Sequence, residues 1–154
     1  MAHISDTALE RLEVLVGRWR TEGQTSDASG GNRIDAIDTY ERLPGGALLH
    51  LVDARVGEDT VEGAEIIGHD PDRNAYVTQY FGTDGPTAYE ASLAQEGDSL
   101  TWRMESKTTR FTGTFSANGN VISGHWELHD QSGDWQRWMD ITLTKQTSPQ
   151  IPSA

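Results

Sequence analysis

The chain of 154 residues contains no cysteine. Disulfide bonds, thiolate nucleophiles and cysteine-bound zinc or iron–sulfur centres are therefore excluded. Basic residues are also scarce, with 12 Lys and Arg against 24 Asp and Glu, which gives a formal net charge of −12. Because phosphate backbones and anionic membranes are bound by clustered basic side chains, this balance argues against nucleic acid and membrane partners.

Long apolar runs are missing as well. No stretch approaches the ~20 apolar residues of a membrane span, and the N-terminal "MAHISDTALERLE" has neither the basic start nor the apolar core of a signal peptide. The sequence therefore predicts a cytoplasmic protein. Its length fits a single domain, placed at residues 1–146, and the polar segment 147–154 is expected to be a disordered tail.

One helix is predicted, in "SDTALERLEVL", where Ser5 or Asp6 can cap the first turn. Gly17 can end this helix in a left-handed conformation. The apolar stripe of the helix consists of Leu9, Leu12 and Val16.

The rest of the chain alternates apolar and polar residues in short segments separated by turn residues, as antiparallel strands do. Ten strands are predicted, at residues 17–25, 33–43, 47–56, 61–69, 75–81, 87–95, 99–106, 108–116, 121–129 and 135–145. An open sheet of this kind would expose aggregation-prone edges, whereas an up-and-down barrel has none. An immunoglobulin-like sandwich fits less well, because long crossings join its strands. We therefore predict an all-β antiparallel barrel with a short N-terminal helix.

A helix followed by Gly17-x-Trp19 on the first strand is a calycin feature, in which the Trp plugs the closed end of a barrel. Together with "ERLPGGALLHL", "IIGHDPDRNAYVTQYF", "GTFSANGNVISGHWE" and a Trp-rich last strand, it resembles a bacterial lipocalin-like family of unknown function, distantly related to nitrobindin-type haem barrels. The resemblance covers residues 9–145 and implies a ten-stranded barrel with a lumen, but no reaction. Trp19 is then a core residue whose N–H meets a backbone carbonyl or another ordered partner, and Arg18 or Arg20 is expected to cover its ring.

A barrel of this size encloses more volume than side chains fill, which predicts binding of a small, largely apolar molecule. The apolar faces of the last four strands are expected to point inward, with Trp135 on the inward face and Trp138 opposite. The lumen would then be an aromatic box with few polar groups, although core packing is an alternative role for each aromatic side chain. The candidate ligand-binding residues are Tyr80, Tyr89, Trp102, Met104, Phe111, Trp126 and Met139.

The same alternation makes predictions about the outer surface. Arg103 and Glu105 lie opposite Trp102 and Met104 and are expected to be exposed; if they were buried, an acid–base enzyme would be favoured. Segment 47–56 is apolar on both faces apart from His50 and Asp53, which suggests a homodimer interface.

Signals for catalysis and cofactors are few. There is no Gly-x-Ser-x-Gly elbow or phosphate-binding loop, so catalytic residues stay unassigned. A nucleophile would have to be Ser or Thr, with His50, His69 or a carboxylate as its base, and nothing selects one. A barrel can still catalyse isomerisation, cyclisation or hydration with a single acid such as Glu105, Tyr80 or Tyr89. No metal or cofactor is predicted. His125 and His129 in "HWELH" lie about 13 Å apart along a strand, so we interpret this segment as a solvated outer face. Haem binding is a lesser alternative, because the last strand lacks the histidine on which the related barrels hold haem.

Overall fold

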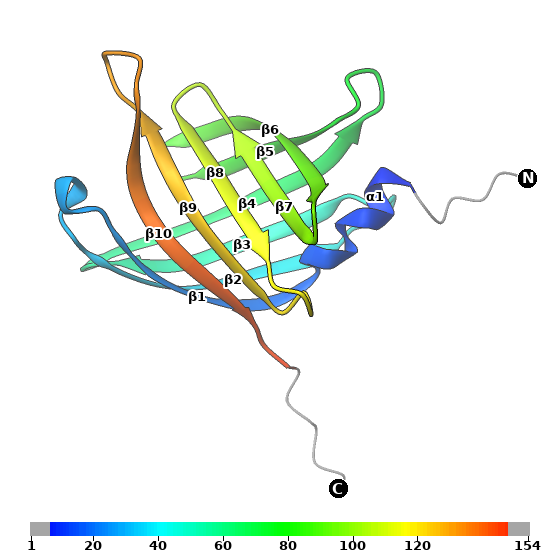
Figure 1. Cartoon of the computed structure of the whole chain (residues 1–154), viewed down its shortest axis with the longest axis horizontal. Coiled ribbons are helices and arrows are strands. Elements are labelled where there is room, and N and C mark those ends of the chain that lie inside the picture. Colours follow the sequence, from blue (N-terminus) through cyan, green and yellow to red (C-terminus); the bar gives the residue numbers. More distant parts are fainter. Residues whose placement is uncertain (1–6, 148–154) are drawn as a thin grey trace, which may run out of the picture.

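The computed structural model of the chain describes residues 7–147. Residues 148–154 of the predicted tail lie outside the described residues, as do Ser5 and Asp6. A short helical segment is followed by ten antiparallel strands that close into one barrel (Figure 1). Each strand pairs with its neighbours in the chain, and the first pairs with the last. The predicted fold class is therefore confirmed. Among the described residues, no helix is long and apolar enough to cross a membrane.

The strands follow the predicted segments closely. They are β1 (Gly17–Thr25), β2 (Arg33–Arg42), β3 (Leu48–Val56), β4 (Asp59–Asp70), β5 (Ala75–Gly82), β6 (Gly85–Glu96), β7 (Ser99–Glu105), β8 (Thr109–Phe115), β9 (Val121–His129) and β10 (Trp135–Lys145). Strands β4 and β6 begin earlier than the sequence predicted. Gly57 and Gly85 have φ of 61° and 100°, so the chain reverses tightly before β4 and at the start of β6.

The helical segment is shorter than predicted. Helix α1 covers only Ala8–Arg11, and a 3-10 turn, η1 (Leu12–Leu15), follows it. The N-cap is Thr7, whose hydroxyl oxygen accepts a hydrogen bond from the Glu10 backbone N–H. Because residues three apart eclipse in a 3-10 turn, Leu12 and Leu15 both point into the barrel and are fully buried. Gly17, with φ of 137°, begins β1 rather than ending a helix.

Trp19 closes the helix end of the barrel. It is completely buried, and its ring N–H donates to the Leu15 carbonyl oxygen at 2.9 Å, as expected. The predicted cover by Arg18 or Arg20 is wrong. Adjacent residues on a strand point to opposite faces, so the cation over the ring is Lys145, which lies directly opposite on β10 with its Nζ 5.0 Å from the ring centre.

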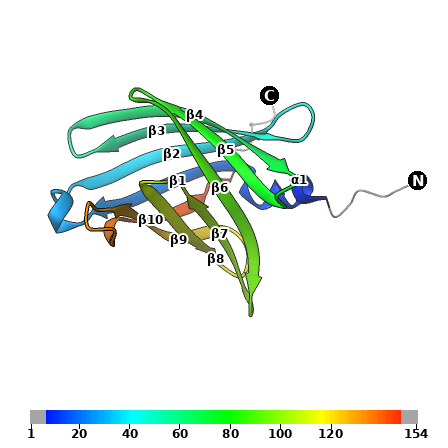
Figure 2. The same ribbon diagram turned by 90° about the horizontal axis from the view of Figure 1, so that it is seen from above.

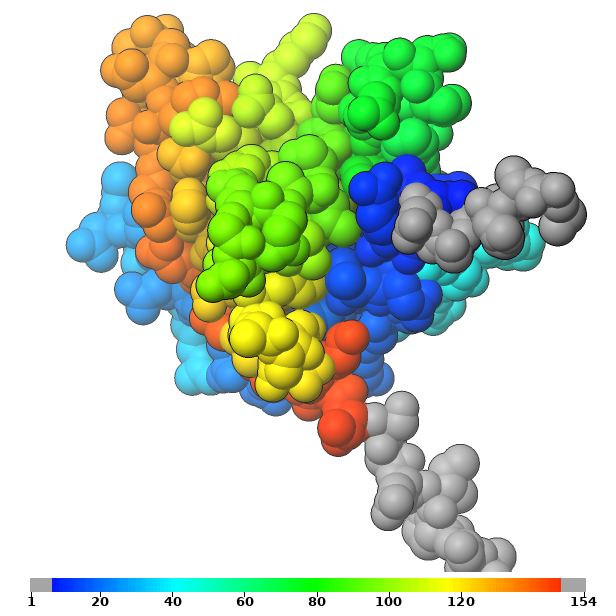
Figure 3. All heavy atoms as spheres, turned by 45° about the vertical axis from the view of Figure 1, so that its right-hand side comes forward, coloured from blue at the N-terminus to red at the C-terminus, as the bar shows by residue number. Residues whose placement is uncertain are grey.

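The barrel has a packed half and an accessible half. Its walls are β2–β4 on one side and β7–β10 on the other (Figure 2). At the end covered by α1 and η1, shown in blue in Figure 3, the inward side chains of all strands are packed and almost without exposed surface. Towards the other end, inward-facing Tyr80, Tyr89, Trp126 and Met139 are only half-buried. The lumen is therefore accessible from the end opposite the helix.

A β-bulge in β10 changes one predicted orientation. The register with β9 shifts between Arg137 and Met139. Trp135, predicted to face inward, instead stacks on His129 with the rings 4.6 Å apart on the outer face, under the Arg110 guanidinium. Trp138, predicted to face outward, contacts Trp126 with ring centres 6.3 Å apart. The extra residue of the bulge reverses the alternation upstream of it.

Candidate functional site

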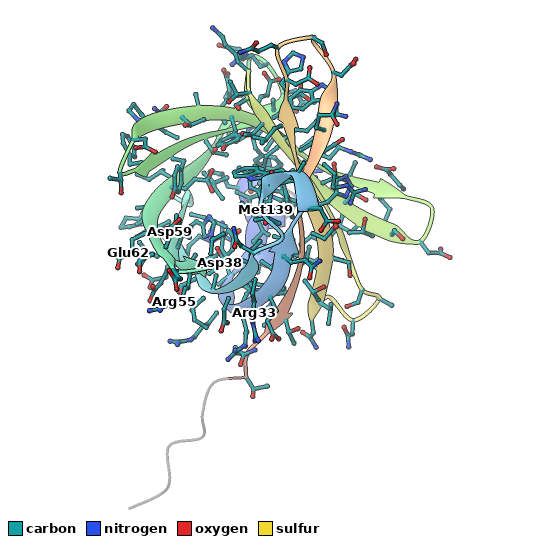
Figure 4. The ribbon with its side chains drawn as sticks, turned by 90° about the vertical axis from the view of Figure 1, so that its left-hand side faces the viewer. Arg33, Asp38, Arg55, Asp59, Glu62 and Met139 are labelled. Carbon is teal, nitrogen blue, oxygen red and sulfur yellow. The ribbon has the colours of Figure 1, made fainter. Side chains whose placement is uncertain are left out.

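A row of polar and aromatic side chains crosses the inner face of four neighbouring strands. Tyr40 on β2, His50 on β3, Glu65 on β4 and Tyr80 on β5 lie directly opposite one another in the strand registers. Asp38 precedes Tyr40 by one inward position. Closure of the barrel thus turns residues from distant parts of the sequence into one wall of the lumen. Figure 4, viewed from the end opposite the helix, shows Asp38 pointing into this space.

His50 joins the two carboxylates of this wall. Its Nε2 lies 2.7 Å from Asp38 Oδ1, and its Nδ1 lies 2.9 Å from Glu65 Oε1. Thr21 Oγ1 donates to Asp38 Oδ2 at 2.5 Å, and Thr78 Oγ1 donates to Glu65 Oε2 at 2.7 Å. Every carboxylate oxygen therefore has a donor, as buried charged groups require.

Both ring nitrogens of His50 face a carboxylate, which fixes its charge. Burial disfavours the cation and is the largest single influence on the pKa of His50. The hydrogen bonds and negative charges of Asp38 and Glu65 together outweigh burial and raise the pKa from 6.5 to about 9. At neutral pH the ring is an imidazolium that donates one hydrogen bond to each carboxylate. Tyr40 stacks on it, with ring centres 4.0 Å apart and planes 6° apart.

Two hydroxyl groups of the wall lack partners. Among the described residues, neither Tyr40 Oη nor Tyr80 Oη forms a hydrogen bond within the protein, yet neither oxygen is fully enclosed. Both therefore border space that water can reach. Burial, with the negative charges of the cluster, raises the pKa of Tyr40 well above its usual value and also raises that of Tyr80, so both hydroxyls stay protonated. The Tyr80 ring lies over Gly63, where any larger side chain would collide with it.

The opposite wall of the lumen is apolar. Met104, Phe111, Trp126 and Met139 lie opposite one another on β7 to β10. The Trp126 ring is 5.1 Å from Phe111 and 6.0 Å from Tyr89. Aromatic rings at these distances and tilts form a continuous surface for an apolar ligand.

The structure thus separates the predicted ligand-binding residues into three places. Tyr80 belongs to the polar wall. Trp102, 2% exposed and 5.7 Å from the Tyr76 ring, belongs to the packed half near the helix. The remaining members form the apolar wall: Tyr89, Met104, Phe111, Trp126 and Met139. Contact of any of them with a ligand stays a prediction.

Two expectations about polar residues have different outcomes. Arg103 and Glu105 are exposed on the outer face, as predicted, and Arg103 pairs there with Glu96. The prediction of a lumen with few polar groups is wrong, because Asp38, His50 and Glu65 are all buried or nearly so. The sequence contained a signal for them: Asp38 shares its strand face with Ile34 and Ala36, and Glu65 with Ile67. A charged residue on an otherwise apolar strand face needs a buried partner.

Three of the described histidines, His50, His125 and His129, contact or lie beside polar groups of the protein. Within residues 7–147, no group of three His, Asp or Glu side chains has the arrangement of a metal site. Both nitrogens of His50 are engaged. His125 and His129 lie on the outer face, where Glu127 beside His125 is held by Arg110 at 2.8 Å. These contacts match the interpretation of "HWELH" as an outer face.

A hollow of about 860 Å³ beside α1 is a less suitable site. It extends over β5 to β8 and borders the inward-facing Tyr76, Ala91, Met104 and Phe111. Its charged lining residues include Arg11, Arg73, Glu90, Arg103, Glu105 and Lys107. Arg73 pairs with Glu90 and Arg103 with Glu96, all about half-exposed. Because exposed pairs are screened by water, they exert weaker electrostatic effects than the buried cluster, and we place the candidate site in the lumen.

Comparison with known proteins supports the architecture. The barrel is similar to Rv2717c from M. tuberculosis, with a TM-score of 0.69 and 12% identity over 92% of this chain and 98% of that chain. It is also similar to the S-type phycobiliprotein lyase CpeS from Guillardia theta, with a TM-score of 0.62 and 11% identity over 90% of this chain and 92% of that chain. No protein-family profile matches the chain, and no curated protein matches its sequence. The two structural likenesses show that the fold is a lipocalin-like barrel.

Proposed function

We propose that the protein binds a small, largely apolar molecule in the accessible half of the lumen. The observation that carries this proposal is the half-buried state of inward-facing Tyr80, Tyr89, Trp126 and Met139, in a barrel whose other half is packed. Aromatic side chains that face inward and still keep exposed surface provide apolar area for a ligand to cover. The packed half supplies a rigid floor.

An environment-sensitive apolar dye tests this function. The dye is expected to gain fluorescence in the lumen and to quench tryptophan emission. Trp126→Ala should weaken binding roughly tenfold, because one aromatic contact and its buried area are lost. Arg103→Ala, on the outer face, should bind as the unaltered protein does. Absence of dye binding, or equal loss in both variants, would contradict binding in the lumen.

A cofactor-independent enzyme is the second candidate. The buried Asp38–His50–Glu65 cluster and the free hydroxyl of Tyr80 favour it, because proton transfer needs groups held in a dry, fixed arrangement. A barrel of the same fold is named as a phycobiliprotein lyase, so the fold is compatible with catalysis. Mass spectrometry of co-purifying molecules, before and after incubation with the protein, tests this candidate. Products that the unaltered protein forms and that Tyr80→Phe does not form would support an isomerase, cyclase or hydratase. A Soret band would instead support the lesser alternative, haem binding.

We also propose that the protein forms a homodimer through the outer face of β3 to β5. Leu51, Ile66 and Phe81 are 40%, 46% and 52% exposed there. Leu51, Ala64 and Phe81 are directly opposite one another on the three strands. Exposed large apolar side chains grouped in this way mark an interaction surface.

Membership of the bacterial lipocalin-like family stays a prediction, as does the distant relation to nitrobindin-type barrels.

A further inference from the structure

The lumen carries a net negative charge. Asp38 and Glu65 contribute one negative charge each, and the His50 imidazolium compensates only one of them. Two cationic side chains at inward strand positions of the described chain are Arg42 and Lys145, and both belong to the helix end. Arg42 is held there by Glu13 and the carbonyl oxygens of Leu9 and Gly46, and Lys145 covers Trp19. Neither is available to neutralise the accessible half.

The polar wall also contains unused hydrogen-bonding capacity. Tyr40 is only 8% exposed, and its hydroxyl has no partner among the described residues. Its oxygen nevertheless borders open space, as does that of Tyr80. A hydroxyl that borders open space and has no partner in the protein can form a hydrogen bond with a ligand or a water molecule. Each carboxylate oxygen has one donor and can accept another, so the wall as a whole is rich in acceptors.

We propose that the ligand presents an amine to this wall and an aromatic or alkyl body to the Trp126 wall. This inference rests on the proposed function, and it specifies the class of ligand. A protonated amine donates up to three hydrogen bonds to the carboxylate and phenol oxygens, and its charge neutralises the cluster. A carboxylate of the same shape meets a like charge in a poorly hydrated space, where repulsion is strong. Fatty acids in their anionic form are therefore expected to bind weakly.

Three naphthalene probes of similar shape test the proposal: naphthylmethylamine, naphthylmethanol and naphthoate. Calorimetric titration at neutral pH is expected to show the amine binding at least about tenfold more tightly than the carboxylate, with the alcohol between them. Glu65→Gln should reduce the preference for the amine, because it removes one negative charge. Glu105→Gln, which removes the same charge from the outer face, should leave the preference unchanged.

Tyr80→Phe provides a second test that does not depend on the buried charges. Its hydroxyl has no partner in the protein, so its removal should leave folding intact, while affinity for both the amine and the alcohol falls by about threefold or more. Equal binding of the three probes, or tighter binding of naphthoate, would overturn the amine assignment while leaving binding in the lumen standing. Dye binding without binding of any probe would overturn it as well. Failure of the dye and all probes would instead overturn the proposed function.

Discussion

His50 keeps its proton because two carboxylates accept from it inside the barrel, at 2.7 and 2.9 Å. A single histidine thus determines the net charge of the lumen and holds together β2, β3 and β4. Its partners are themselves fixed by Thr21 and Thr78, so the ring has little freedom to turn. Such a residue contributes to stability in a way that depends on pH.

Stability is expected to fall as the pH rises from 6.5 to 9. The folded-state pKa of about 9 lies above the ordinary 6.5, so the contribution of His50 is complete below pH 6.5 and is lost as the pH passes 9. The shift corresponds to about 3 kcal/mol at most. Urea unfolding across this range measures the slope, and His50→Gln should make it nearly flat. An imidazole NMR titration midpoint near 6.5 in the folded protein would contradict the prediction.

The helical segment and β1 act together as the closed end of the barrel. Leu12, Leu15 and Trp19 are fully buried, and the Trp19 ring meets Phe115 edge-on at 6.4 Å. The hydrogen bond from Trp19 to the Leu15 carbonyl fixes η1 over the barrel end. This end is structural, and the polar cluster adjoins it, with Asp38 directly opposite Trp19 in the strand register.

Trp19→Ala should therefore lower the free energy of unfolding by about 3–5 kcal/mol, the usual cost of deleting a large buried side chain. Arg20→Ala, the neighbouring exposed position, should change it by less than about 1 kcal/mol. Chemical denaturation measures both. Unchanged stability combined with lost dye binding in Trp19→Ala would show that Trp19 contacts the ligand and does not merely close the barrel.

At the scale of the whole molecule, the net charge of −12 favours solubility and opposes random association. The exposed apolar side chains on the outer face of β3 to β5 are therefore an exception on an otherwise charged surface. Charged side chains of both signs lie beside them. Arg55 on β3 and Glu62 on β4, both labelled in Figure 4, are exposed on this outer face. Two copies related by a two-fold axis present the same surface to each other, so an apolar centre with charges of both signs around it can be self-complementary.

Sedimentation velocity over a range of concentrations tests the dimer. The unaltered protein should sediment as a dimer, and Phe81→Asp should shift it to a monomer, because a charge would be buried at the centre of the contact. Thr142→Asp adds the same charge to an exposed position on β10 and should leave the dimer intact. A monomer at the highest soluble concentration would refute the interface.

The extent to which the site could be predicted differs between its two walls. The apolar wall was largely predictable. Met104, Phe111 and Trp126 each lie on the apolar face of their own strand, and the alternation of apolar and polar residues within that strand identifies this face. The polar wall was harder to predict. Asp38 and Glu65 each stand on an otherwise apolar strand face, which indicates a buried partner, but that partner, His50, lies 12 and 15 residues away and only the strand register identifies it. The bulge before Met139 was also invisible, since nothing local in the sequence marks an extra residue.

The sequence by itself determined the elements: ten strands from period-two alternation and turn residues, the absence of thiol chemistry, and the position of Trp19 after a short helix. These are local properties, set by side-chain sterics and by the burial of one strand face. Only the tertiary structure decided which residues meet across strands, because register and closure bring distant positions together. It placed Lys145 over Trp19 and brought Trp138 into contact with Trp126. It also enclosed Asp38, His50 and Glu65 in the lumen, where charges interact more strongly than they do in water.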